Sequence, residues 1–127
     1  ILFLLIFLIS TILPDIDTPH SKIGRKVLPL SYMLNLIFGH RGFLHSIWIP
    51  LGVVALSFYL GSQFIGLTFF GGYVLHLIVD TLTIGGVKWL GPVGGKVKGL
   101  FPTGGFSEAV IFSILLILLA LEITKLF

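Results

Sequence analysis

The stretch FIGLTFFGGYVLHLIVDTLTI, residues 64–84, decides how this chain folds. It is mostly apolar, and its two ionisable side chains, His76 and Asp80, both lie near its end. A helix needs about 20 apolar residues to cross the hydrocarbon core of a bilayer. The sequence therefore predicts a membrane-spanning helix over residues 64–84 that carries a histidine and an aspartate toward one end.

The composition of the whole chain indicates a membrane protein. Hydrophobic residues make up 56% of the 127 residues and charged residues only 10%, against about 25% charged in soluble domains. So few charges cannot cover a water-exposed surface, which excludes soluble globular and disordered proteins.

The length fits one domain over residues 1–127. The chain has no cysteine, which excludes disulfides and thiolate sites, and its one adjacent basic pair, Arg25-Lys26, gives little support to nucleic-acid binding.

Other apolar stretches predict further helices on either side of this span. Residues 1–13 are apolar but short for a span, so we expect a fragment whose first membrane helix is truncated. Residues 85–106 are rich in glycine and proline and are predicted to form a loop. The predicted fold class is an all-α membrane protein, a bundle of about four transmembrane helices with a short interfacial helix. The expected spans are residues 1–13, 43–60, 64–84 and 107–121, and the interfacial helix is residues 28–38.

The short turn at residues 61–63 predicts the topology. Three residues cannot cross a membrane, so the spans on either side form a hairpin, and the loops at 14–42 and 85–106 lie on one side. These two loops hold seven of the eight Lys and Arg residues. Because basic residues accumulate on the cytoplasmic side, that face is predicted to be cytoplasmic.

His76 and Asp80 form the first candidate site. Their i, i+4 spacing on a helix places both side chains on one face, about 5–6 Å apart at Cβ. An imidazole and a carboxylate there suit Zn, Mn or Fe. The alternative is a His–Asp hydrogen bond that joins two helices. The apolar setting favours the metal, because ionisable groups inside a membrane are usually functional.

Two further motifs hold candidate ligands. In Gly39–Ser46 (GHRGFLHS) the glycines indicate that His40 lies in a loop and that His45 opens the next helix. The alternative for either histidine is an interfacial anchor. Arg41 either binds a substrate phosphate or carboxylate or extends to lipid headgroups.

Asp15 and Asp17 follow the first apolar stretch in the motif Leu13-Pro14-Asp15-Ile16-Asp17. Either carboxylate is a candidate metal bridge or general base, and the alternative is a turn or capping role. The remaining polar residues have simpler interpretations. His20 is expected to be solvated, Glu108 to favour a helix dipole, and Thr81 and Thr83 to hydrogen-bond to backbone or to a ligand carboxylate.

Three ordered motifs carry a family resemblance. They are Leu13–Asp17, then Gly39–Ser46, then Gly72–Thr83 (GYVLHLIVDTLT), and Pro102–Gly105 followed by Glu108 is similar to a closing motif. In this order and spacing they resemble the YdjM-like family of membrane-bound hydrolases regarded as metal-dependent. The resemblance implies a helical membrane protein with a metal site made from His40, His45, His76, Asp80, Asp15 and Asp17. It also suggests a distant similarity to the zinc-dependent phospholipase C group of all-helical phosphoesterases.

Two departures from the family pattern stand out. Family members begin with a helix that bears an early His-Gly pair, which this sequence lacks, and Thr18 stands where many members have histidine. The expected function is hydrolysis of an ester or phosphoester of a small molecule or lipid at the cytoplasmic face of the inner membrane. A divalent metal, first of all Zn, would activate water, with Asp15 or Asp17 as base and Arg41 stabilising negative charge. The alternative is a non-enzymatic scaffold, or a proton or metal-ion transporter that uses the same His/Asp cluster.

Overall fold

The computed structural model describes residues 1–21, 23–38 and 43–102, together with residues 110, 113, 114, 117 and 121. The regular secondary structure of these residues is helical, and they form no β-strand, only two isolated β-bridges. Four α-helices and four short 3-10 turns make up this part of the chain. The helices are α1 (Leu2–Ile12), α2 (Leu28–Phe38), α3 (Trp48–Tyr59) and α4 (Gln63–Leu82), and the turns are η1 (Leu13–Asp17), η2 (Gly24–Val27), η3 (Phe43–His45) and η4 (Gly91–Val93).

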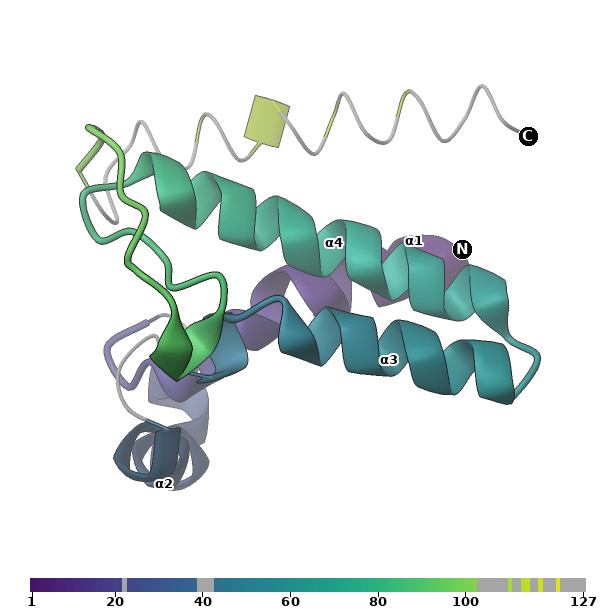
Figure 1. Cartoon of the computed structure of the whole chain (residues 1–127), viewed down its shortest axis with the longest axis horizontal. Helices are drawn as coiled ribbons and strands as arrows, with labels where there is room; N and C mark the ends of the chain where they lie inside the picture. The colour runs from purple at the N-terminus through teal and green to yellow at the C-terminus, as the bar shows by residue number, and fades with distance from the viewer. Residues whose placement is uncertain are drawn as a thin grey trace.

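Helices α1, α3 and α4 run along one common direction, and α4 contacts both of the others (Figure 1). Helices α3 and α4 form the predicted hairpin. Gly61 ends α3 in the left-handed conformation, with φ of +71°, which glycine adopts without steric cost. The segments after α1 and after α4 then lie at the same end of the molecule, as the sequence predicts. Helix α2 lies there too and is seen end-on in Figure 1, across the direction of the other three.

Small residues bring α1 and α4 close together. A Cβ atom added at Gly72 would lie 2.4 Å from the carbonyl oxygen of Phe7 and 2.1 Å from Oγ of Ser10. Because the first of these is a backbone atom, it cannot move aside cheaply, and only glycine fits at this crossing. At the neighbouring Gly71 the nearest atom would be 3.7 Å away, an ordinary contact. The close approach fixes how α4 sits against the end of α1.

Helix α4 is the one α-helix of the described chain that is both long and apolar enough to cross a membrane. Its 20 residues span about 30 Å at 1.5 Å per residue. Helix α3 has 12 residues, so the span predicted over residues 43–60 is shorter than expected. Pro50 lies in its first turn, where the ring removes a backbone donor and restricts the preceding residue, and the chain before Trp48 forms η3 instead.

The membrane bundle is therefore supported in part. Helix α4 matches the predicted span 64–84, and α1 and α2 match the predicted helices 1–13 and 28–38 closely. The fourth predicted span, residues 107–121, lies mostly outside the described residues, although residues 110, 113, 114, 117 and 121 are each helical.

A small core joins the second half of α4 to the loop that follows it. Tyr73, Leu77 and Val87 are fully buried, and four partly buried side chains pack against them: Leu13, Ile49, Phe69 and Trp89. Val87 is held by a bridge to Val97, with N–O distances of 2.8 and 2.9 Å. Trp89 donates its indole hydrogen to Thr81 Oγ1 at 2.9 Å. The described part of the predicted loop 85–106 is thus folded back onto α4.

Candidate metal centre

The turn after α1 positions two carboxylates. Pro14 is buried in the first turn of η1, and because proline breaks a helix interior but suits a first turn, α1 ends there. Asp15 and Asp17 follow on η1. The turn is closed by Ser21, whose hydroxyl donates to the carbonyl of Asp15 at 2.8 Å and accepts from the amide of Gly24 at 2.8 Å. These bonds hold the carboxylates against the rest of the site.

His45 comes from η3, three residues before α3, and not from the first turn of a helix as predicted. Its position is fixed from two sides. The buried hydroxyl of Tyr73 on α4 donates to the carbonyl of Leu44, and Nδ1 of His45 lies 3.2 Å from Oδ2 of Asp17. With a proton on Nδ1, the imidazole donates to that carboxylate, and its Nε2 presents a lone pair on the opposite side of the ring.

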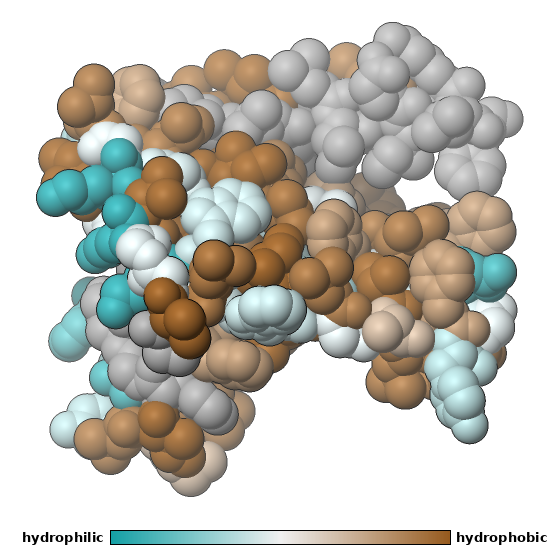
Figure 2. Space-filling model, viewed as in Figure 1, coloured by the Kyte–Doolittle hydropathy of each residue, from teal (hydrophilic) through white to brown (hydrophobic). Residues whose placement is uncertain are grey.

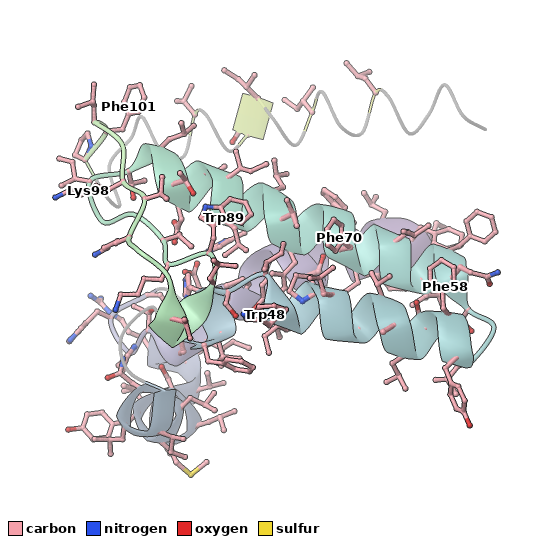
Figure 3. The ribbon with its side chains drawn as sticks, viewed as in Figure 1. Trp48, Phe58, Phe70, Trp89, Lys98 and Phe101 are labelled. Carbon is pink, nitrogen blue, oxygen red and sulfur yellow. The ribbon has the colours of Figure 1, made fainter. Side chains whose placement is uncertain are left out.

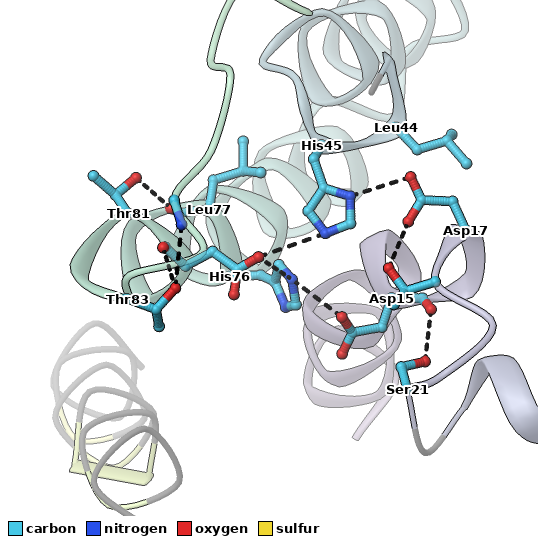
Figure 4. A network of polar contacts seen from close by, with 12 residues as sticks. Asp15, Asp17, Ser21, Leu44, His45, His76, Leu77, Thr81 and Thr83 are labelled. Carbon is cyan, nitrogen blue, oxygen red and sulfur yellow. Dashed lines mark hydrogen bonds and ion pairs between the residues drawn. The ribbon is translucent and has the colours of Figure 1, made fainter. Parts of the chain in front are cut away.

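His76 and Asp80 share one face of α4, as their spacing predicts. Nε2 of His76 lies 3.7 Å from Oδ2 of Asp80 on the same helix and 3.7 Å from Oδ1 of Asp15 on η1. The same Asp80 oxygen lies 3.5 Å from Nε2 of His45. Figure 4 shows these side chains directed toward one another from three separate segments. The two imidazole rings are 5.6 Å apart between centroids.

These distances match a shared metal ion better than direct hydrogen bonds. A hydrogen bond between nitrogen and oxygen spans about 2.7–3.2 Å, whereas a tetrahedral ion with bonds near 2.0–2.1 Å holds its ligand atoms about 3.4 Å apart. Nε2 of His45 and Nε2 of His76 are buried and have no hydrogen-bond partner within the described chain. One atom each of Asp15, His45 and His76 lies within 4.8 Å of the others. The donor set of two imidazoles and carboxylates fits Zn, Mn or Fe.

Asp17 has a different place from Asp15. Its Oδ2 contacts Nδ1 of His45, on the far side of the ring from the converging Nε2 atoms, and its Oδ1 accepts from the Thr18 hydroxyl at 3.1 Å. Such a carboxylate behind a ligating histidine fixes the tautomer and the ring orientation. Asp15 instead reaches the centre itself.

Within the described part of the chain, Asp15 is the most exposed member of this cluster. Its side chain is 40% exposed, whereas the side chains of Asp17, His45, His76 and Asp80 are between 0 and 10% exposed. Among these five side chains, Asp15 is therefore the one that is most accessible from outside.

The remaining residues that the sequence singled out fall into two groups. His40, Arg41 and Glu108 lie outside the described residues. His20 is exposed, as expected. The hydroxyls of Thr81 and Thr83 donate to the carbonyls of Leu77 and Asp80 at 2.7 and 2.8 Å, which is the backbone role that the sequence allowed.

Two residues that position the site, Asn35 and Tyr73, were not predicted from the sequence. Nδ2 of Asn35, on α2, donates to the carbonyl of Asp17 at 3.1 Å, and Tyr73 holds Leu44 as described above. Asn35 had a signal, because an amide in an otherwise apolar segment costs free energy unless it is hydrogen-bonded. Tyr73 had none, since tyrosine is common in apolar helices and its partner is a backbone carbonyl 29 residues away.

The fold and the cluster together define a class: a helical membrane protein with buried histidine and aspartate side chains converging at one end. The comparisons with known proteins agree. A family model described as "YdjM inner membrane protein" matches residues 1–126, and the chain belongs to that family. The resemblance drawn from the three motifs is thereby confirmed, and with it a membrane location.

Two relatives show how far the similarity extends. YvsG of Bacillus subtilis is 35% identical over 108 residues, covering 83% of this chain and 68% of YvsG. The inner membrane protein YdjM of Escherichia coli K12 is 34% identical over 94 residues, covering 67% of this chain and 46% of YdjM. The aligned part is thus about half the length of YdjM. No solved structure matches the chain.

Proposed function

We propose that this protein is a membrane-bound hydrolase that uses a divalent metal ion, first of all Zn, to cleave an ester or phosphoester. The observation that carries the proposal is the convergence of two buried imidazole nitrogens and two carboxylates, which come from three segments in all and lie at distances suited to a shared ion. Ionisable groups buried in a membrane protein are costly and mark functional sites. A divalent ion held there supplies Lewis-acid polarisation of the substrate and activation of water.

Each residue of the cluster then has a role. His45, His76 and Asp80 would hold the ion from the buried side, and Asp15 would complete the ligand set from the exposed side or serve as the general base. Asp17 orients His45 through Nδ1. A substrate approaches past Asp15, the exposed member of the cluster.

A transporter that uses the same cluster is less well supported. A transport path needs polar groups that continue across the bilayer and remain available to the cargo. Beyond the cluster, Ser57 and Thr68 occupy the opposite half of the described hairpin, and their hydroxyls donate to carbonyls of their own helices at 2.7 and 2.6 Å. These groups are already hydrogen-bonded and do not extend the cluster across the membrane.

Removal of the metal tests the hydrolase directly. The protein, purified in detergent with its metal retained, is expected to hydrolyse an ester or a phosphodiester from a panel of soluble and lipid substrates. Dialysis against a chelator should abolish turnover, and addition of Zn or Mn should restore it. The measurements are metal content by mass spectrometry and turnover before and after chelation. Metal-free purified protein that also fails to bind added Zn or Mn would contradict the proposal.

The metal centre is proposed to face the cytoplasm. Arg25, Lys26, Lys88, Lys96 and Lys98 all lie in the segments at the end of the molecule that holds the cluster, and basic residues accumulate on the cytoplasmic side. The turn at Ser62 is then extracytoplasmic. In intact cells a membrane-impermeant thiol reagent should label Ser62→Cys and leave Lys98→Cys unlabelled until the cells are opened. The opposite labelling pattern would reverse the orientation.

A further inference from the structure

Helix α2 turns its apolar side away from the protein. Leu36 is 72% exposed and Ile37 63%. Four more side chains of the helix that are exposed in the same way are Leu28, Leu30, Tyr32 and Met33. So many exposed apolar side chains on one short helix mark a surface that something apolar covers.

The opposite side of α2 carries polar residues and packs against η1 and η2. Ser31 is fully buried, and Asn35 donates to the carbonyl of Asp17 on η1. A surface helix of a soluble protein places its apolar stripe against the core and its polar face in water. Helix α2 does the reverse, so the medium around it is less polar than the turn beneath it.

The charges around α2 are complementary to an anionic surface. Arg25 and Lys26 are exposed on η2, directly before the helix, and the loop at the same end of the molecule exposes Lys88, Lys96 and Lys98. The acidic residues within the described segments are Asp15, Asp17 and Asp80, and all three belong to the metal cluster. Figure 2 shows the hydrophilic side chains gathered mainly at this end, beside a largely hydrophobic face.

The orientation and level of α2 fit the boundary of a bilayer. Helix α2 lies across the direction of α1, α3 and α4 (Figure 1). When α4 crosses the membrane, α2 therefore lies along the membrane plane. Two tryptophans, which are enriched at membrane interfaces, lie toward the same end of the helices (Figure 3). Trp48 begins α3, and its indole lies 3.4 Å from the carbonyl of Leu90, while Trp89 is bonded to Thr81 near the end of α4.

We infer that α2 and η2 form a lipid-docking surface that binds the anionic leaflet of the membrane. The six exposed apolar side chains of α2 insert among acyl chains, and Arg25 and Lys26 lie at the phosphate groups of the headgroups. Because Asn35 joins the helix to the Asp17 carbonyl, the bound lipid surface also holds the turn that carries Asp15 and Asp17. This surface is independent of whether the metal centre hydrolyses anything.

Single-cysteine labelling tests the inference, because the natural chain has no cysteine. The full chain carrying Leu36→Cys is labelled with an environment-sensitive fluorophore and reconstituted in phosphatidylcholine vesicles with or without phosphatidylglycerol. We expect a blue-shifted emission that is quenched by lipids brominated on their acyl chains, more strongly when phosphatidylglycerol is present. A probe on Lys26→Cys, the control on η2 two residues before α2, should instead be quenched by aqueous iodide. Ile37→Cys serves as a second apolar-face variant in case one label disturbs folding.

The outcomes separate the lipid surface from its rivals. Quenching of both apolar-face probes by iodide and not by brominated lipid would overturn the inference. Probes that neither iodide nor brominated lipid quenches, together with disulfide-linked dimers of the same single-cysteine variants left unlabelled and treated with a mild oxidant, would overturn it in favour of a second copy of the chain. Loss of the phosphatidylglycerol effect in the variant Arg25→Gln with Lys26→Gln would support the role of the two charges, and an unchanged effect would overturn that role. None of these readouts depends on metal or turnover.

Discussion

The variant that carries His45→Gln and His76→Gln is expected to lose its bound divalent metal. The two imidazole Nε2 atoms are the buried nitrogens that converge on the proposed ion. Replacing even an outer partner of a metal ligand typically lowers affinity 10–100-fold, so removal of two ligands should lower it by more than about a hundredfold. Turnover should disappear with the metal. The measurement is a competition titration with a chromophoric chelator, followed by metal content of the purified protein.

Glutamine is chosen because its side chain is similar in size to histidine and can still form hydrogen bonds with the buried aspartates. Alanine would leave a cavity and buried carboxylates without a hydrogen-bond partner. His20→Gln is the matched control: the same residue change at an exposed position outside the cluster, where metal affinity should stay unchanged. Circular dichroism in the presence of chelator should show equal helix content in all three proteins. Full metal occupancy in the double variant would refute the site.

Asp17→Asn is expected to weaken metal binding without abolishing it. The substitution keeps the shape of the side chain but removes the negative charge that accepts the Nδ1 proton of His45 at 3.2 Å. Loss of such a partner costs about 10–100-fold in affinity, while the ligands themselves remain. Titration should therefore show a shifted dissociation constant and the same number of ions bound per chain at saturating metal.

Thr18→Val provides the control for this prediction. It removes the 3.1 Å hydrogen bond to the other carboxylate oxygen of Asp17 and leaves the charge in place, so only a small change in affinity is expected. If Asp17 has only a structural role, Asp17→Asn should be less thermally stable than the wild type when both are metal-free in chelator, and the affinity for metal should not shift. X-ray absorption adds a second test: loss of an oxygen ligand in Asp17→Asn would show that Asp17 binds the ion directly, as the sequence allowed.

Much of the architecture is encoded locally. The length of the apolar run at residues 64–84 predicts α4, and the glycine-containing turn at 61–63 predicts the hairpin, because both depend only on neighbouring residues. The i, i+4 pair on α4 follows from helical geometry alone. In contrast, the start of α3 was misplaced, since the segment around His45 is shaped by Trp89, whose carbonyl accepts the amide of Ile47 at 2.9 Å.

The candidate site, too, was predictable from the sequence only in part. Sequence composition identified the few ionisable residues of an apolar chain as the functional candidates, because burying a charge in such a chain is costly wherever it occurs. It could not separate Asp15 from Asp17, which have the same chemistry two positions apart in one motif.

By itself, then, the sequence determined the helices, the hairpin, the membrane class and the residue types of the site. The tertiary structure alone decided that Asp15 reaches the converging histidines while Asp17 stands behind His45, and that α2 turns its apolar side outward. The difference lies in how far apart along the sequence the interacting residues are. Helix formation and hydropathy depend on residues a few positions apart, whereas these contacts join η1 to residues 18 or more positions away. The close crossing at Gly72 sets α4, which carries His76, against α1.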